Sequence, residues 1–408
     1  MDESIARNLI HSPELFEKAS FEARKEELNI NNIVRMELFL WDLELFLQIQ
    51  HLHGDSIVLK GGAAVQFYLP VENQRTSVDI DMIFSGKEEE IYKTLDFISH
   101  KFGCKNGLLV FTPFVPKNPK TKLPLRTFMI DIPSVFDERV LRSGGCTKNP
   151  DHGGRPLKTE FFLRPGVLNI NKLSGRNIFA GSSDKIYNVL PINQLFADKL
   201  TTLGPETIGI QNSRIDEQAK QLYDLCMLLN CNLSNISLKE VKEYYWKYAE
   251  MECKDREITF STDRIIADVK SQLSRIKRID ISNDEELKQK INDFKGLYLN
   301  RASNFSVPMA AIAGEQLSLL YDCLLTEKFD LIKQLFVLAE QCKLHSYSGP
   351  ARGDKERQIK EGIIKYFNAT EIPDKILKGK SLIRVFWCVV SLENLFQIRD
   401  FLNDELEV

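Results

Sequence analysis

The sequence predicts an α+β fold, with a mixed β-sheet and flanking helices in the N-terminal half and a mainly α-helical C-terminal half. Candidate strands rich in β-branched and apolar residues cluster before residue 190. Beyond that point apolar residues recur at helical spacing almost to the end of the chain. The 408 residues suffice for two to three domains with cores of their own. We therefore expect an N-terminal domain over residues 1–190 and a helical domain over residues 191–408.

Short apolar runs bounded by turn residues predict the strands of the first domain, and longer runs at helical spacing predict its helices. The expected strands are 56–60, 78–84, 107–112, 125–133, 159–163, 166–170 and 186–190. The expected helices are 33–53, 61–69 and 87–102.

The second half of the chain reads as helices separated by short Gly, Pro, Asn or Ser breaks. Its expected helices are 192–203, 213–229, 238–252, 262–276, 284–299, 307–325, 328–343, 354–368 and 384–404. Apolar stripes on the later helices are typical of a packed bundle, which we expect over residues 231–408.

Composition indicates an intracellular protein. The eight cysteines form no C-x-x-C pair and have no histidines at zinc spacing, so we expect reduced and mostly buried thiols. The N-terminus has no basic region followed by an apolar run, and no apolar stretch approaches a membrane span. These features predict a cytoplasmic protein without a membrane partner. A net charge of −3 excludes a chain that binds nucleic acid through overall charge alone.

A glycine turn between a strand and a helix is the first functional signal. The strand expected up to Lys60 is broken by Gly61 and Gly62, and a helical run follows until Pro70. Glycines at such a junction let backbone amides approach an anion, and the N-terminus of the following helix favours negative charge there. The turn is therefore a candidate phosphate-binding site.

Two carboxylates follow on the next expected strand. Period-2 geometry places Asp79 and Asp81 on one face, while Val78, Ile80 and Met82 occupy the other. Two such carboxylates repel each other unless a cation or a proton is shared, and Mg²⁺ is typically held by one or two carboxylates and by substrate phosphates. For an Asp-x-Asp pair alone, a solvated strand face is the commoner explanation; the glycine turn upstream favours a metal site.

A third carboxylate would complete a two-metal site, and Asp131 is our candidate. It lies between Ile130 and Ile132 on the strand expected at 125–133, where a lone charge needs a partner or a metal. The alternatives are that Asp131 caps the turn at Pro133 or pairs with an arginine.

Here the chain resembles the nucleotidyltransferase superfamily and, within it, the AbiEii/AbiGii toxin family. The resemblance rests first on the Lys60-Gly61-Gly62 turn and on the run from Arg75 through Ser77 to Asp79 and Asp81. It extends to Pro191–Leu200, which resembles the helix that delivers a lysine, here Lys199, and to Arg214–Leu225, which resembles a later basic helix and carries Lys220 and Asp224. The resemblance implies that residues 1–190 are a nucleotidyltransferase-like catalytic domain and that residues 191–230 complete its active site.

These two helices can also be interpreted without the family. Leu195, Phe196 and Leu200 form an apolar stripe that leaves Lys199 near its edge. Lys220 and Asp224 are four residues apart on one helical face, where an ordinary surface ion pair is the simpler explanation.

The resemblance implies transfer of a nucleoside monophosphate from an NTP to an acceptor, with Mg²⁺ as cofactor in a two-metal site formed by Asp79, Asp81 and Asp131. In this interpretation Lys199 acts in catalysis together with the three carboxylates. The residues expected around the nucleotide are Lys60, Gly61, Gly62, Arg75, Ser77, Arg214, Lys220 and Asp224.

Two segments with an excess of basic residues, Lys117–Arg126 and Arg142–Lys158, flank the expected strand that carries Asp131. They suit a polyanionic acceptor such as the 3′ end of a tRNA, although solubilising loop charge explains them equally well. The resemblance further implies the toxin of a toxin–antitoxin or phage-exclusion system with a separately encoded antitoxin. The alternatives are transfer to a small-molecule or protein hydroxyl, or a catalytically silent protein that binds nucleotide or a partner.

Overall fold

The computed structural model describes residues 3–102, 109–114, 124–136, 157–344, 352–367, 376 and 381–406. Its contacts divide the chain into two compact units. The first unit comprises residues 1–199, 248–260 and 293–303, and the second comprises residues 200–247, 261–292 and 304–408. Three of the five boundaries, those after residues 199, 247 and 292, fall inside helices. The expected functional division near residue 190 stays a prediction.

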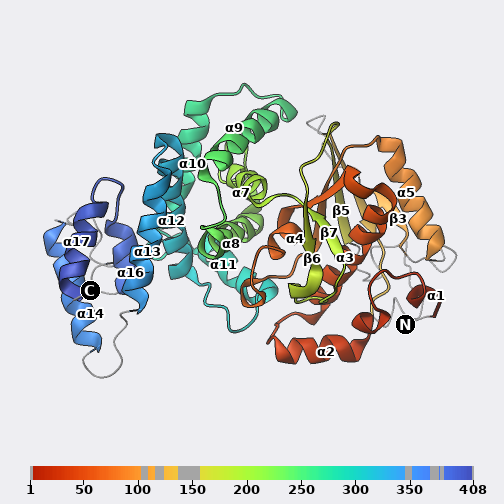
Figure 1. Ribbon diagram of the computed structural model, residues 1–408, viewed down its shortest axis with the longest axis horizontal. Helices are drawn as coiled ribbons and strands as arrows, with labels where there is room; N and C mark the ends of the chain where they lie inside the picture. Colours follow the sequence, from red (N-terminus) through yellow and green to blue (C-terminus); the bar gives the residue numbers. More distant parts are fainter. Residues whose placement is uncertain are drawn as a thin grey trace. The chain divides into compact units, whose positions relative to one another are not determined.

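A seven-stranded mixed sheet forms the centre of the first unit, in the order β3-β4-β5-β2-β1-β7-β6 (Figure 1). Strand β2 pairs antiparallel with β1 and parallel with β5, so it lies in the middle of the sheet. The described strands are β1 (Ile57–Lys60), β2 (Asp79–Phe84), β3 (Phe111–Pro113), β4 (Leu125–Ile130), β5 (Leu157–Leu163), β6 (Asn171–Ser174) and β7 (Ile186–Val189). The predicted α+β class is confirmed.

Helices and short 3-10 segments surround this sheet (Figure 1). They are α1 (Glu3–Ala6), η1 (Pro13–Phe16), α2 (Lys18–Glu27), α3 (Ile33–His53), η2 (Gly54–Ser56), α4 (Gly61–Gln66), η3 (Val71–Asn73), α5 (Glu88–Lys101), η6 (Gly175–Asn177) and α7 (Ile192–Thr201). The expected helices at 33–53, 61–69 and 87–102 are confirmed, although the second ends early at Gln66.

Helix α3 is the main core element of the first unit, since Met36 to Ile49 is buried throughout. It begins at Asn32, whose side chain accepts a hydrogen bond from the Arg35 N–H. One of its buried polar residues, Glu44, has two partners in the N-terminal segment, His11 and Ile10. Glu44 accepts from the His11 ring at 2.7 Å, and the other nitrogen of that ring lies 2.7 Å from the Tyr187 hydroxyl. This buried chain ties the N-terminal segment to α3 and β7.

The second unit is helical, as expected. The helical segments that follow α7 are η7 (Asn212–Arg214), α8 (Ile215–Asn232), α9 (Leu238–Asp255), α10 (Thr262–Lys277), α11 (Glu285–Tyr298), α12 (Val307–Thr326), α13 (Phe329–Leu344), α14 (Arg352–Tyr366), α16 (Leu382–Val389) and α17 (Leu395–Leu406). Of these, only residues 248–255 of α9 and 293–298 of α11 belong to the first unit. Helix α12 contacts α8, α10, α13 and α16 and is therefore the centre of this unit. Gly314 allows the close approach of α10, because a Cβ there would press on the Lys277 backbone.

A buried arginine links three segments of the second unit. The Arg384 guanidinium donates to both Asp280 carboxylate oxygens at 3.2 Å, to Glu315 at 3.3 Å and to the Lys277 carbonyl at 2.6 Å. Burial acts against its charge, but these carboxylates prevail and raise the pKa of Arg384. A buried arginine with this many partners fixes α16 against α12 and the end of α10.

Two sequence predictions of secondary structure are wrong. The strand expected at 166–170 is absent: Gly166 has a φ of 120°, and the ladder with β7 starts only at Asn171. The helix expected at 384–404 is two helices, α16 and α17. Between them the Ser391 N–H donates to Asn394 Oδ1 at 2.7 Å, and the Asn394 N–H donates to Ser391 Oγ at 3.2 Å. This capping arrangement begins a new helix.

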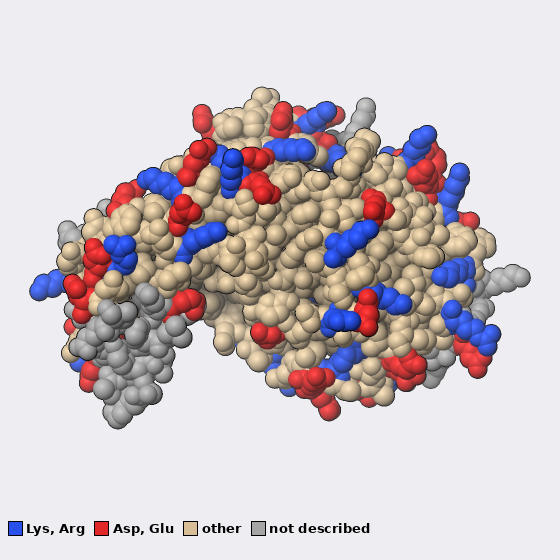
Figure 2. Space-filling model, in the orientation of Figure 1, with Lys and Arg blue, Asp and Glu red and all other residues tan. Residues whose placement is uncertain are grey.

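Among the described residues, no helix combines the length and the apolar character that crossing a membrane requires. The described cysteines are free thiols, and Cys226, Cys253 and Cys323 are buried, as expected. Acidic and basic side chains are intermingled on the face of the molecule that Figure 2 shows. The basic segment at 142–156 and most of Lys117–Arg126 lie outside the described residues.

Candidate functional site

Strand β2 presents its two aspartates as the sequence predicts. Its residues alternate between partly exposed and buried, so Asp79 and Asp81 share one face of the sheet while Ile80 and Met82 pack beneath the other. In the ladder, Asp81 lies between Lys60 of β1 and Glu160 of β5. Directly paired residues point to the same face, so these three side chains converge.

A chain of charged contacts runs across this face. The carboxyl groups of Asp81 and Glu160 share a hydrogen bond, and Glu160 also accepts from the Lys158 ammonium at 2.6 Å. On the other side, the Lys60 ammonium donates to Asp198 of α7 at 2.9 Å and lies 4.2 Å from the centre of the Phe162 ring. The face thus carries two adjacent carboxyl groups, each with a lysine beside it.

The proton balance of the carboxyl pair follows from this arrangement. Burial, the neighbouring Glu160 and the nearby Asp79 raise the pKa of Asp81 to about 8, against the opposing effect of Lys60. Burial alone would raise the pKa of Glu160 as well, but the Lys158 ammonium prevails and lowers it. Near neutral pH the pair therefore holds one proton, mainly on Asp81.

The two lysines stay charged despite their burial. Burial acts to lower the pKa of Lys60, and the carboxylates of Asp198 and Asp81 outweigh it and raise the pKa. The pKa of Lys158 is likewise raised, because Glu160 outweighs the effect of burial. Two fixed ammonium groups thus flank the carboxyl pair.

The glycine turn lies directly against these residues. Gly61 has a φ of 69°, and a Cβ at this position would overlap the Asp81 carboxylate. A Cβ on Gly62 would meet the Arg75 guanidinium and Ser77 Oγ. The two glycines are therefore required so that a carboxylate, a guanidinium and a hydroxyl can all approach the N-terminus of α4.

Arg75 and Ser77 are buried in the segment that leads into β2. The Arg75 guanidinium donates to the Thr76 carbonyl at 2.9 Å, and the Arg75 N–H donates to Gln66 Oε1 of α4 at 2.9 Å. Ser77 Oγ donates to the Asp79 carbonyl at 3.3 Å. These bonds fix the approach to β2 against α4.

Lys199 is buried near the end of α7, next to Asp198, whose carboxylate holds Lys60. Arg214, Lys220 and Asp224 belong to the second unit. Arg214 is exposed in η7, whereas Lys220 and Asp224 are buried on α8. The Lys220 ammonium donates to Glu217 at 2.9 Å. The burial of both residues contradicts the alternative of a surface ion pair between Lys220 and Asp224.

The carboxylate beside the Asp79–Asp81 pair is Glu160, which the sequence analysis did not single out. Asp131 follows the last residue of β4, and β5 lies between β4 and β2. Two strand spacings alone are about 9.5 Å. The Asp131 backbone instead continues the pairing toward β3, with its N–H donating to the Val110 carbonyl at 3.0 Å.

Asp42 of α3 is another acid that the sequence analysis missed. It is fully buried, and neither carboxyl oxygen has a hydrogen-bond partner among the described residues. Burial raises its pKa well above the ordinary value, and the nearby charges of Asp79 and Asp81 act in the same direction. Burial and the two neighbouring carboxylates thus both act against ionisation of Asp42.

The carboxylate oxygens on this face are suitable ligands for a hard divalent cation, because Mg²⁺ prefers oxygen ligands of this kind. Asp81 and Glu160 share a proton that neutralises part of their negative charge, and a cation bound between them would neutralise the same charge. Among the residues that the structure describes, no group of three or more acidic, histidine or cysteine side chains is already arranged around a single point.

Comparison with known proteins identifies a family to which this sequence is similar. The model of the family described as "Nucleotidyl transferase AbiEii toxin, Type IV TA system" matches residues 45–303. A solved structure of MenT4, a nucleotidyltransferase toxin from Mycobacterium tuberculosis H37Rv, is similar at 16% identity and a TM-score of 0.38, covering 59% of this chain and 74% of that chain. No curated protein matched the sequence.

Proposed function

Because the chain belongs to the AbiEii nucleotidyl transferase toxin family and is a nucleotidyltransferase, we propose that it transfers a nucleoside monophosphate from an NTP to an RNA acceptor, such as the 3′ end of a tRNA, in the presence of Mg²⁺. We further propose that it acts in the cytoplasm as the toxin of a toxin–antitoxin or phage-exclusion system, opposed by a separately encoded antitoxin. The observation that carries the proposal is the Asp79–Asp81 pair placed against the Gly61–Gly62 turn.

We propose Asp79, Asp81 and Glu160 as the metal ligands, with Glu160 in the place first expected for Asp131. Bound Mg²⁺ would neutralise phosphate charge and lower the pKa of the acceptor hydroxyl. Loss of the proton that Asp81 shares with Glu160 makes both carboxylates available as ligands. The ammonium groups of Lys60 and Lys158 then hold the remaining negative charge in place.

The glycine turn and its neighbours suit the phosphates of the NTP. The backbone N–H groups at the start of α4 and the Arg75 guanidinium are hydrogen-bond donors beside one another, and Ser77 Oγ lies next to them. We also propose that residues of the helical segments act on the nucleotide, namely Lys199, Arg214, Lys220 and Asp224. Catalysis in this scheme is positioning and charge stabilisation around the transferred phosphorus.

Two other functions remain open to experiment. The acceptor could instead be a small molecule or a protein hydroxyl, since no described residue fixes the acceptor class. The second alternative is a catalytically silent protein that binds nucleotide or a partner. The complete Asp79–Asp81 pair argues against this alternative, because loss of one acid would already inactivate such a site.

Glu160 and Asp131 can be separated by a pair of matched variants. We expect Glu160→Gln to reduce nucleotidyl transfer by about 10²-fold or more and to raise the Mg²⁺ concentration needed for half-maximal rate, because a ligand and the partner of Asp81 are removed together. Asp131→Asn should leave both quantities within about twofold. The reverse result, with Asp131→Asn inactive and Glu160→Gln active, would restore the assignment made from the sequence.

The acceptor is tested by incubating the protein with each NTP labelled at the α-phosphate, Mg²⁺, and total RNA or total protein. We expect label in RNA with the wild-type chain and none with Asp79→Ala. Label in protein or in small products alone would overturn the RNA proposal. Induced expression should arrest growth and Asp79→Ala should relieve the arrest; arrest by both variants would contradict a toxin that acts through this site.

A further inference from the structure

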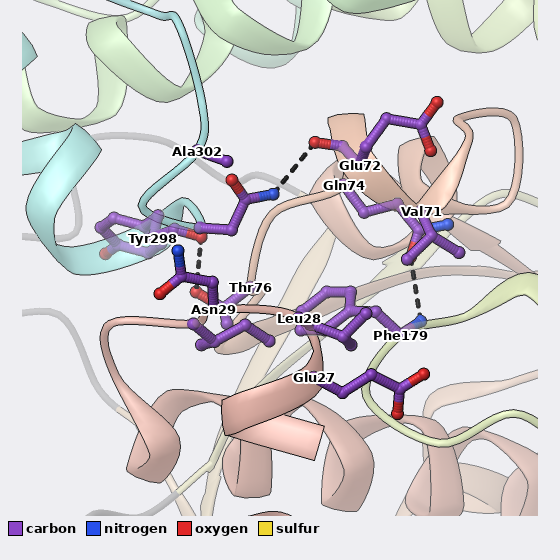
Figure 3. A pocket seen from close by; sticks show the side chains of 12 residues that line it. Glu27, Leu28, Asn29, Val71, Glu72, Gln74, Thr76, Phe179, Tyr298 and Ala302 are labelled. Carbon is purple, nitrogen blue, oxygen red and sulfur yellow. Dashed lines mark hydrogen bonds between the residues drawn. The ribbon is translucent and has the colours of Figure 1, made fainter. Parts of the chain in front are cut away.

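A pocket of about 290 Å³ opens in the first unit, and its lining includes none of the carboxylates of β2 (Figure 3). Four separate segments form it: the end of α2 with the residues after it, η3 with the segment leading into β2, Phe179, and residues 298–302. Nothing in the proposed transfer reaction uses this pocket, so its chemistry has to be considered by itself.

The pocket walls are tied together by hydrogen bonds. The Thr76 N–H donates to the Tyr298 carbonyl at 3.0 Å, and Asn300 Nδ2 donates to the Glu72 carbonyl at 3.0 Å. The Phe179 N–H donates to Gln74 Oε1 at 3.0 Å. Figure 3 marks these bonds as dashed lines. Because each bond joins segments distant in the sequence, the pocket is preformed rather than created by a ligand.

The two charged residues of the pocket lining, Glu27 and Glu72, are both acidic. Glu27 and Glu72 are both exposed, and Figure 3 shows their carboxylates at opposite ends of the lining side chains. Asn300 Oδ1 is buried and has no hydrogen-bond partner among the described residues. The described lining residues include no lysine, arginine or histidine. The two charged side chains of the lining are therefore both negative and both accessible to a ligand.

The rest of the lining is apolar. Ile30 and Phe179 are buried beneath the pocket, and Leu28 and Val71 contribute further aliphatic surface. Such a lining removes the stem of a ligand from water, while the carboxylates remain in contact with solvent. A phosphate or a nucleic-acid backbone is excluded, since it would meet two negative charges with no compensating cation.

We propose that this pocket binds a guanidinium group carried on a short aliphatic stem. A planar guanidinium pairs with a carboxylate through two parallel N–H donors, the second carboxylate adds to the negative potential of the pocket, and the aliphatic stem matches the apolar lining. The group can come from an exposed arginine side chain of another protein or from a free small molecule. The site does not depend on the transfer reaction, so its test needs no NTP.

The test is calorimetric titration of the full chain at low salt with acetyl-Ala-Arg-Ala-amide, with the same peptide carrying citrulline, and with agmatine. Citrulline keeps the shape but lacks the charge. We expect the arginine peptide to bind with a dissociation constant of about 1 mM or tighter and the citrulline peptide at least tenfold more weakly. If the arginine peptide binds more tightly than agmatine, the natural ligand is an arginine side chain of a protein. If agmatine binds more tightly, the natural ligand is a free small molecule.

Three variants complete the test. Glu27→Gln and Glu72→Gln should each weaken binding of the arginine peptide roughly two- to fivefold, and the double variant about tenfold. Glu26→Gln removes the same charge from an exposed residue of α2 outside the lining and should change nothing. The proposal is overturned by equal binding of the arginine and citrulline peptides, by an unaffected double variant, or by no binding of either guanidinium probe.

Discussion

Asp81→Asn abolishes nucleotidyl transfer, with an expected loss of about 10³-fold or more, because the amide cannot replace a charged ligand beside the phosphates. The same substitution stabilises the protein in the absence of divalent metal. Asparagine resembles the protonated acid that shares a hydrogen bond with Glu160, but it cannot ionise between Glu160 and Asp79. Loss of activity combined with a gain in stability is typical of a functional site.

The pH dependence of that gain has a definite sign. In the folded protein the pKa of Asp81 is raised to about 8 from an ordinary value of 3.8. Its protonated form therefore contributes stability that is fully present below about pH 4 and is lost as the pH rises through 8. Asp81→Asn and wild type should have similar stability at acidic pH, and the variant should be more stable by at least about 1 kcal/mol near pH 9.

Urea unfolding in the presence of a chelator, at acidic and alkaline pH, measures this difference. Asp184→Asn is the matched control, because Asp184 is an exposed carboxylate paired with Arg176 on the surface. That control should keep both the activity and the pH profile of the wild type. An Asp81→Asn variant less stable than wild type at every pH would contradict the shared proton.

Gly61→Ala is expected to be the second most damaging change. The backbone there has a φ of 69°, and the new Cβ would overlap the Asp81 carboxylate. The strained backbone costs about 1 kcal/mol, and displacement of the carboxylate should reduce transfer by about 10²-fold, since small misplacements of reacting groups have effects of that size. Initial rates and thermal unfolding measure the two effects separately.

Gly54→Ala separates backbone strain from steric overlap. Gly54 also has a positive φ, 55°, but an added Cβ would have no neighbour within 4 Å. We expect this control to lose about 1 kcal/mol of stability and to keep its activity. Equal activity of the two alanine variants would show that the approach of Asp81 to the turn does not matter for transfer.

The sequence predicted the glycine turn and the Asp79–Asp81 strand well because both depend on local rules. Period-2 alternation and a strand broken by two glycines are visible within 25 residues. The structure confirms the strand and shows what the glycines permit, namely contact with Asp81 and with Arg75.

Glu160 could not be chosen over Asp131 from the sequence, because the choice depends on strand order. Both acids lie on or next to apolar strands, and only the β5–β2 pairing brings Glu160 beside Asp81. The one signal available was Lys158-Thr159-Glu160, an alternating strand with opposite charges on one face. Asp198 and Asp42 were missed for the same reason, since their importance comes from neighbours distant in the sequence.

A comparison of two labels on one NTP tests whether the Asp79–Asp81 site carries out nucleotidyl transfer. The protein is incubated with Mg²⁺, total RNA and either the α-labelled or the γ-labelled form of each NTP. We expect label to enter the acceptor from the α-phosphate only, and to disappear in Asp79→Ala. Label from the γ-phosphate would indicate phosphoryl transfer instead, and undiminished α-label with Asp79→Ala would exclude this site as the place of reaction.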